Sequence, residues 1–212
     1  MPPAAGESTS GASWPPPAGV PLLDAVTHAW KESVFAPRRF FPQLGRGQSL
    51  APSLWYYIAV GLIVSGIGLF WQMVFPAAQP SYLLARMSGT PMPETHPLQD
   101  FLLAPLVLML SLFITAGVVH VMLLMLGGAK NGFATTIRVF CHAYGAQLAA
   151  ILPFVGGVIG GIWMLALAVI GLREAHDTTT ARAAVAVLLP AFLLILFGIL
   201  AALMLMAGAM AL

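Results

Sequence analysis

Charged residues are scarce in this sequence of 212 residues, where Asp, Glu, Lys and Arg together fill only 8% of the positions. A soluble domain carries roughly 25% charged residues, because it must present a solvated surface. Hydrophobic residues fill 59% of the positions, and the mean hydropathy is +0.91. This composition excludes an ordinary soluble fold and predicts that most of the chain lies in a lipid bilayer.

Three further absences exclude particular chemistries and partners. Cys141 is the only cysteine, so an intramolecular disulfide is excluded. The net charge is only +2 and the cations do not cluster into a basic stripe, so we expect no nucleic-acid partner. The sequence contains no HExxH, GxSxG or GxxxxGK(S/T) motif, and we therefore expect no enzyme activity, no metal and no cofactor.

The N-terminal part divides into a tail and a surface segment. Residues 1–20 are rich in Pro, Ala, Gly and Ser, which predicts a disordered tail. Residues 21–50 form the surface segment. Its first part, 21–35, places apolar side chains on one helical face and polar side chains on the opposite face. This pattern predicts an amphipathic helix that lies in the membrane interface.

The second part of the surface segment is basic and aromatic. We expect Phe40 and Phe41 to dip into the interface. Arg38 and Arg39 would meet anionic headgroups, each contributing on the order of 1 kcal/mol. The sequence therefore predicts a juxtamembrane anchor ahead of the first membrane crossing.

Residues 51–212 contain four long tracts without charge, and a helix needs about 20 apolar residues to cross the hydrocarbon. The tract at 139–172 has 34 residues and would be about 51 Å long as one helix, which is too long for one crossing. Pro153, near its middle, predicts a tight turn at Leu152-Pro153-Phe154. The predicted crossings are therefore 54–75, 101–126, 134–152, 154–172 and 183–206.

The distribution of cations favours this division. Five crossings leave eight Lys and Arg on one side and only Arg86 on the other, and the positive-inside rule puts the eight in the cytoplasm. We predict an all-α integral membrane protein, a bundle of five transmembrane helices with an N-terminal amphipathic interfacial helix. Its N-terminus is cytoplasmic and its C-terminus external. The eight cations are Lys31, Arg38, Arg39, Arg46, Lys130, Arg138, Arg173 and Arg182.

Small residues predict where the helices pack, because apolar helices in lipid need small side chains to approach closely. The fourth predicted crossing carries two overlapping small-xxx-small patterns. We expect these four glycines to form a packing face: Gly156, Gly157, Gly160 and Gly161.

Polar groups in and near the crossings are the candidate functional residues. His120, Arg138 and His142 lie in predicted crossings, where an ionisable group indicates either function or a structural hydrogen bond. Arg138 is near one membrane face, to which its side chain can extend. The loop at 171–182 has three interpretations. Asp177 or Thr178 caps the last helix, which the pattern favours, or the loop is a cytosolic docking surface, or Glu174, His176 and Asp177 bind a metal. Its candidate residues are Arg173, Glu174, His176, Asp177 and Arg182.

A series of short segments carries a family resemblance. They are Phe35-Ala-Pro-Arg-Arg-Phe-Phe, Leu126-Gly127-Gly128, Phe133-Ala-Thr-Thr-Ile-Arg138-Val-Phe-Cys-His-Ala-Tyr144, Ile151-Leu-Pro153, Ile162-Trp163 and the stretch from Gly171 to Pro190. In their order and spacing, over roughly residues 25–205, these segments resemble the Yip domain family of Rab-interacting membrane proteins, in particular its bacterial branch. The resemblance implies five crossings and a cytoplasmic N-terminus. The chain lacks the Asp-Leu-Tyr-Gly-Pro-type segment of the eukaryotic relatives.

The sequence is compatible with two functions. The first is a non-catalytic membrane adaptor or organiser in a bacterial cytoplasmic membrane. Its partners would be the lipid bilayer and a cytosolic or membrane protein, or a second copy of the chain. The alternative is a small channel or transporter with a polar path near His120, Arg138 and His142.

Overall fold

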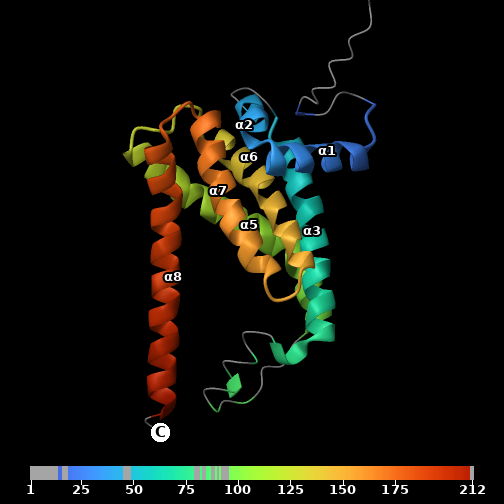
Figure 1. Cartoon of the computed structure of the whole chain (residues 1–212), viewed down its shortest axis with the longest axis vertical. Coiled ribbons are helices and arrows are strands. Elements are labelled where there is room, and N and C mark those ends of the chain that lie inside the picture. Colours follow the sequence, from blue (N-terminus) through green and yellow to red (C-terminus); the bar gives the residue numbers. More distant parts are fainter. Residues whose placement is uncertain are drawn as a thin grey trace, which may run out of the picture.

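The computed structural model describes residues 14–15, 19–44, 49–78, 82, 85–86, 89, 91 and 96–210. Most of the predicted disordered tail and Arg46 lie outside these residues. Within them, every regular element is helical (Figure 1). In chain order the elements are α1 (Leu22–Phe35), α2 (Pro37–Phe40), η1 (Phe41–Leu44), α3 (Ala51–Val74), η2 (Pro76–Ala78), α5 (Pro97–Met125), α6 (Phe133–Ala143), η3 (Tyr144–Ile151), α7 (Gly156–Ala175) and α8 (Thr180–Met210).

Four of the described helices are long and apolar enough to cross a membrane, namely α3, α5, α7 and the Thr180–Met204 part of α8. The remaining predicted crossing, at 134–152, is not one long α-helix. It consists of α6, with 11 residues, followed by the 3-10 helix η3, with 8. A 3-10 helix rises about 2.0 Å per residue, so the two segments together reach about 32 Å.

The break predicted at Pro153 is confirmed. The helical segment ends at Ile151, Leu152 is extended, and Phe154 has a φ of +65°. The chain then reverses, and α7 packs along η3 as the second arm of a hairpin.

The four glycines of α7 face two directions, because successive helical residues are about 100° apart. A Cβ on Gly156 would overlap the carbonyl oxygen of Ala149, and one on Gly160 would lie 2.9 Å from the carbonyl oxygen of Ala146. A Cβ on Gly157 or on Gly161 would meet nothing within 4 Å among the described atoms. Only the first pair therefore packs against η3 in this chain.

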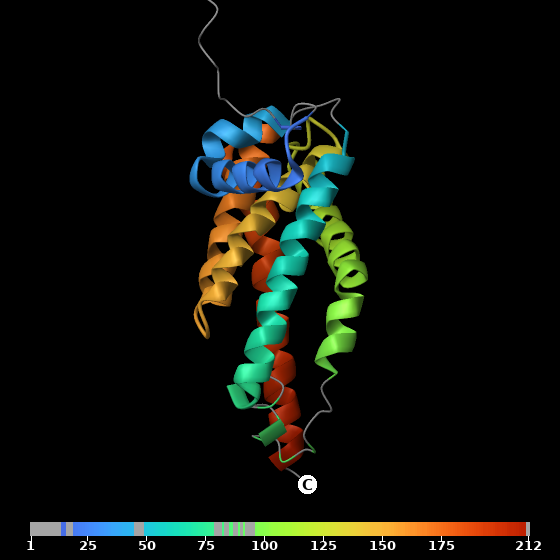
Figure 2. The ribbon, with the colours of Figure 1, turned by 90° about the vertical axis from the view of Figure 1, so that its right-hand side faces the viewer.

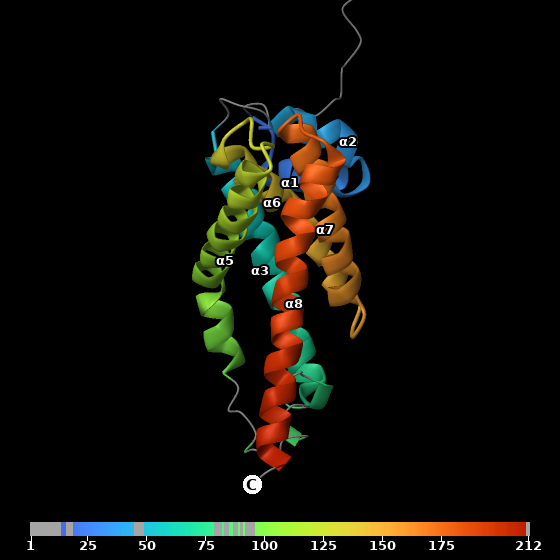
Figure 3. The same cartoon turned by 90° about the vertical axis from the view of Figure 1, so that its left-hand side faces the viewer.

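The basic loops gather at one end of the bundle. Figure 1 shows α1, α2 and the loops that join α5 to α6 and α7 to α8 at this end, while α8 ends at the opposite end. Views from two other sides agree (Figure 2, Figure 3). The side-chain nitrogen of Lys130 donates to the carbonyl oxygen of Asp177 over 2.6 Å, and Arg182 donates to the carbonyl oxygen of Gly127 over 3.3 Å. These bonds join the two loops directly.

The prediction for Phe40 and Phe41 was wrong. Both rings are buried inside the protein rather than in the interface, and only Arg38 and Arg39 face outward. The cause lies in α7, where Gly171 has no side chain and the ring of Phe41 packs against its backbone. The Arg-Arg-Phe-Phe segment thus divides into two exposed arginines and two buried phenylalanines.

An ion pair joins α1 to α2. The Nε atom of Arg39 donates to Glu32 over 2.9 Å, and this hydrogen bond holds the pKa of the Glu32 carboxyl below its ordinary value. Arg39 is exposed, so the pair fixes the corner between the helices and contributes little to stability.

Two indole hydrogen bonds fasten α1 to the hairpin. Trp30 donates its indole N–H to the carbonyl oxygen of Gly145 over 3.0 Å, and Trp163 donates to the carbonyl oxygen of Val34 over 3.2 Å. One bond starts on α1 and the other on α7, so α1 is held by both arms of the hairpin.

Trp163→Phe is expected to loosen α1 without unfolding the bundle. Phenylalanine keeps an aromatic ring but loses the N–H donor, which costs about 1 kcal/mol and should raise amide exchange in α1 about fivefold. Hydrogen-exchange mass spectrometry in detergent measures this. Trp55→Phe is the matched control, because Trp55 is exposed on α3 and its indole donates no hydrogen bond to a described residue. Equal exchange in the two variants would contradict the prediction.

Candidate functional site

A buried chain of hydrogen bonds joins α5, α6 and the end of α7. The hydroxyl oxygen of Thr136, on α6, lies 2.8 Å from Nδ1 of His120 and 2.9 Å from Nε2 of His176. His120 comes from α5, and His176 directly follows α7. The backbone N–H of Asn131 donates to Nδ1 of His176 over 3.2 Å. We call these four residues the His–Thr–His array.

The array has one consistent arrangement of protons when both imidazoles are neutral. A backbone N–H can only donate, so Nδ1 of His176 accepts and its proton sits on Nε2. That Nε2–H donates to Thr136, whose hydroxyl hydrogen is then free to donate to Nδ1 of His120. Each imidazole is thereby fixed in one tautomer. Because His176 and Thr136 are fully buried, the array acts as an internal brace that sets the positions of three elements.

A second branch runs from Asn131 to Arg138. Thr135 donates its hydroxyl to the carbonyl oxygen of Asn131 over 2.8 Å. The guanidinium of Arg138 donates to the hydroxyl of Thr135 over 3.3 Å and to the carbonyl oxygen of Leu44 over 3.4 Å. Arg138 is buried, so its predicted extension to the membrane surface is wrong. Instead, its Nη1 donates to the carbonyl oxygen of Leu44, at the end of η1.

His142 lies apart from this array, in an aromatic cage. Its Nε2 is 3.2 Å from the hydroxyl oxygen of Ser53, which also accepts the indole N–H of Trp14 over 3.1 Å. The rings of Trp14, Phe40 and Tyr56 have centroids 4.4–4.8 Å from that of His142. Trp14 itself is buried, which departs from the disorder predicted for residues 1–20.

The predicted polar path is therefore divided. In the described part of the chain, the hydrogen bonds of His120 and those of His142 share no residue. His142 is fully enclosed, with three aromatic rings around it. A conducting path needs a continuous series of polar groups, and this arrangement lends no support to one.

The predicted docking loop splits into an inward and an outward part. His176 points into the array, whereas the side chain of Asp177 is 95% exposed and lies 3.8 Å from Lys130. Arg173 and Glu174 form an ion pair over 3.6 Å. No group of three His, Cys, Asp or Glu side chains in the described residues lies close enough to hold a metal ion.

The cap of the last helix differs from the two predicted residues. The hydroxyl oxygen of Thr179 accepts the backbone N–H of Arg182 over 3.4 Å, three residues into the turn. Asp177 has a positive φ of 49°, and its side chain points into solvent. The hydroxyl of Thr178 is buried with no hydrogen-bond partner among the described residues. A capping residue directly precedes the first helical turn, and here that position is Thr179.

Thr136 and Asn131 were missed by sequence reasoning. Both are ordinary polar residues next to a loop, where they usually contact water or cap a helix. The sequence feature that could have pointed to them is the Asn131-Gly132 pair, which is typical of a turn and predicts that a helix begins close after it.

One comparison with known proteins finds a protein family. A family model described as the Yip1 domain matches residues 31–202, which is more than half of the chain. No curated protein and no solved structure matches this chain.

Proposed function

This chain belongs to the Yip1 domain family, and we propose that it is a non-catalytic membrane adaptor. The partner would be a cytosolic or membrane protein, docked at the end of the bundle that carries the basic loops. One observation supports this most. The loops after α5 and α7 are fastened to each other by Lys130 and Arg182, and to the bundle interior by His176. A preorganised surface of this kind loses little entropy when a partner binds.

The proposed topology has five crossings, by α3, α5, the α6–η3 segment, α7 and α8. The α6–η3 segment reaches about 32 Å, slightly more than the roughly 30 Å of hydrocarbon. The gathering of the basic loops at one end agrees with the positive-inside rule, which would place that end in the cytoplasm. The membrane would be a bacterial cytoplasmic membrane, with α1 as an amphipathic helix in its interface.

Photo-crosslinking tests the adaptor function. A photoreactive residue at Asp177 should capture one reproducible protein in living cells, whereas the same residue at Met204, exposed near the far end of α8, should not. Lys130→Glu should reduce the capture by about tenfold, since it reverses one exposed charge beside the crosslinking site. The exposed Lys130–Asp177 pair contributes at most about 1 kcal/mol, so the variant should still fold.

Two results would argue against the adaptor. Capture at Asp177 that does not exceed the capture at Met204 would leave the loop end without a partner. If Lys130→Glu folds and captures as much protein as the wild type, the partner does not bind at this surface.

A further inference from the structure

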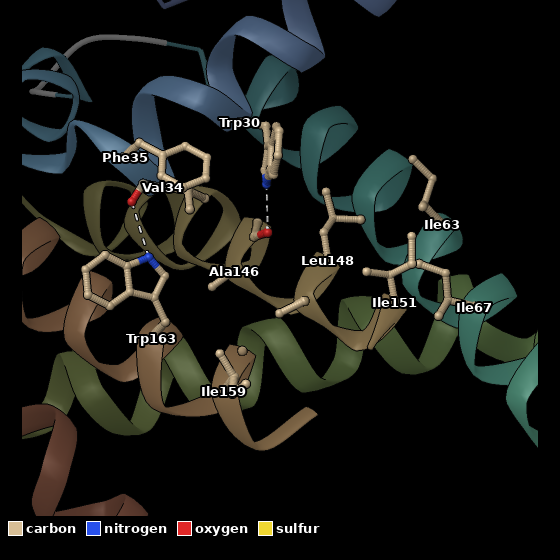
Figure 4. A pocket seen from close by; sticks show the side chains of 13 residues that line it. Trp30, Val34, Phe35, Ile63, Ile67, Ala146, Leu148, Ile151, Ile159 and Trp163 are labelled. Atoms are coloured by element: carbon tan, nitrogen blue, oxygen red, sulfur yellow. Dashed lines mark hydrogen bonds between the residues drawn. The ribbon is translucent and has the colours of Figure 1, made fainter. Parts of the chain in front are cut away.

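An apolar groove lies between α1, α3 and the η3–α7 hairpin. Its volume is about 520 Å³, within the range of small-molecule sites in proteins. Figure 4 shows its walls from close by. Trp30 and Phe35 come from α1, Ile63 from α3, Ile151 from η3 and Trp163 from α7. Segments far apart in the sequence thus form one continuous apolar surface.

The groove offers no polar group to an occupant. The only polar side-chain atoms in its walls are the two indole nitrogens, and both are already bonded. Trp30 donates to the carbonyl oxygen of Gly145 and Trp163 to that of Val34. A bound water needs two to four polar partners, so water is not a stable occupant. The chemistry of the walls fits a hydrocarbon chain.

The length of the groove matches one leaflet of a bilayer. Along one wall it follows η3 from Gly145 to Ile151. The seven residues from Gly145 to Ile151 extend about 14 Å at 2.0 Å per residue. The hydrocarbon of one leaflet is about 15 Å deep, half of the roughly 30 Å core. If α1 lies in the interface, the groove runs from the headgroups toward the bilayer centre.

Cations accompany the groove at its α1 end. Lys31 follows the groove residue Trp30 on α1, and Arg38 lies on α2, just after the groove residue Phe35. Both side chains are exposed, and neither forms an ion pair with a described residue. Glu32, the nearest acidic residue, is already paired with Arg39. Asp24, the other acidic residue of α1, lies two helical turns before Lys31, toward the opposite end of the helix. Near Trp30 and Phe35, Lys31 and Arg38 therefore favour an anionic headgroup.

We infer that the groove binds one acyl chain of an anionic phospholipid from the leaflet next to α1. The headgroup lies beside Lys31 and Arg38, and the chain lies along η3 toward Ile151. The inference uses the proposed position of α1 in the interface but not the identity of any protein partner. Failure of the adaptor experiment would therefore leave it intact.

Native mass spectrometry with a groove-filling variant tests the inference. The full chain is purified from membranes containing phosphatidylglycerol and phosphatidylethanolamine and washed stepwise with detergent. The wild type should retain one phosphatidylglycerol. Ile159→Trp should lower the retained fraction about tenfold, because Ile159 lines the groove and indole fills it. Ile162→Trp should behave as wild type, because Ile162 is similarly exposed on the same helix but outside the groove.

A second arm tests the headgroup. Lys31→Gln combined with Arg38→Gln should retain one phospholipid but lose the preference for phosphatidylglycerol. If Ile159→Trp fails to fold, Ile63→Trp fills the groove from the α3 wall instead.

Three results would overturn the inference. Equal lipid retention in wild type and in the folded groove-filling variants would mean that lipid coats only the outer surface. A wild-type dimer that Ile159→Trp splits would mean that a second copy fills the groove. Retention of phosphatidylethanolamine as readily as phosphatidylglycerol by the wild type would remove the role of Lys31 and Arg38.

Discussion

Gly156→Ala is expected to destabilise the protein by about 1–3 kcal/mol, although it adds only one methyl group. The methyl group would overlap the carbonyl oxygen of Ala149, which belongs to the backbone of η3. A backbone atom cannot move aside as a flexible side chain can, so the two arms of the hairpin must separate. Separation removes close packing along both arms, and packing is the main force between helices in lipid.

Gly157→Ala is the matched control. It adds the same methyl group one residue later, where no described atom lies within 4 Å. Alanine favours the helix over glycine by up to about 1 kcal/mol, so this variant should equal or exceed the wild type in stability. Thermal unfolding in detergent, followed by circular dichroism, compares the two. Equal melting temperatures for Gly156→Ala and Gly157→Ala would refute the close contact between α7 and η3.

Thr136→Val should cost about 2–4 kcal/mol, because it removes the hydroxyl at the centre of the His–Thr–His array without changing the side-chain volume much. Nε2 of His176 then loses its hydrogen bond to Thr136, and Nδ1 of His120 loses its donor. Each lost hydrogen bond costs about 1–2 kcal/mol, because His176 is fully buried and His120 is half-buried. Thr136→Ser restores the hydroxyl and should recover most of the loss.

Thr178→Val is the control for this substitution. The hydroxyl of Thr178 is buried and has no hydrogen-bond partner among the described residues, so its removal should leave stability unchanged or raise it. Unfolding in graded denaturant measures both variants. If Thr136→Val and Thr178→Val have the same stability, the array does not brace the helices.

Part of this fold can be predicted from the sequence alone. The turn at Pro153 follows from a charge-free tract that is too long for one crossing, combined with a residue that interrupts helices. The common side of the basic loops follows from counting Lys and Arg. Both predictions depend on tract lengths and residue types, which the sequence states directly.

Other features depend on contacts between distant segments. The close packing of α7 against the segment after Ala143 depends on Gly156 and Gly160, whose missing side chains leave room for the η3 backbone. An arginine–phenylalanine pattern looks the same in an interfacial anchor and at the edge of a core. Gly171, 130 residues after Phe41, decides between them by leaving space for its ring.

The candidate site illustrates the same limit. His120 and His176 were candidates from their polarity, but their link passes through Thr136, 40 residues before His176. This hydrogen bond exists because α6 packs against the end of α7. No local sequence pattern predicts that contact. Likewise, His142 is separated from His120 because Thr136 and His142, six residues apart, lie on faces of α6 about 120° apart. The positions of polar residues along the sequence do not distinguish the His–Thr–His array from the aromatic cage of His142.

A pair of topology reporters fused after the last helix tests the five-crossing arrangement most directly. One reporter is active only outside the cytoplasm, and the other fluoresces only inside it. If both arms of the hairpin at Pro153 cross the membrane and the basic loops are cytoplasmic, the external reporter should be active after α8. The internal reporter should then fluoresce at the N-terminus. Fluorescence of the internal reporter after α8 would mean an even number of crossings and would contradict the account.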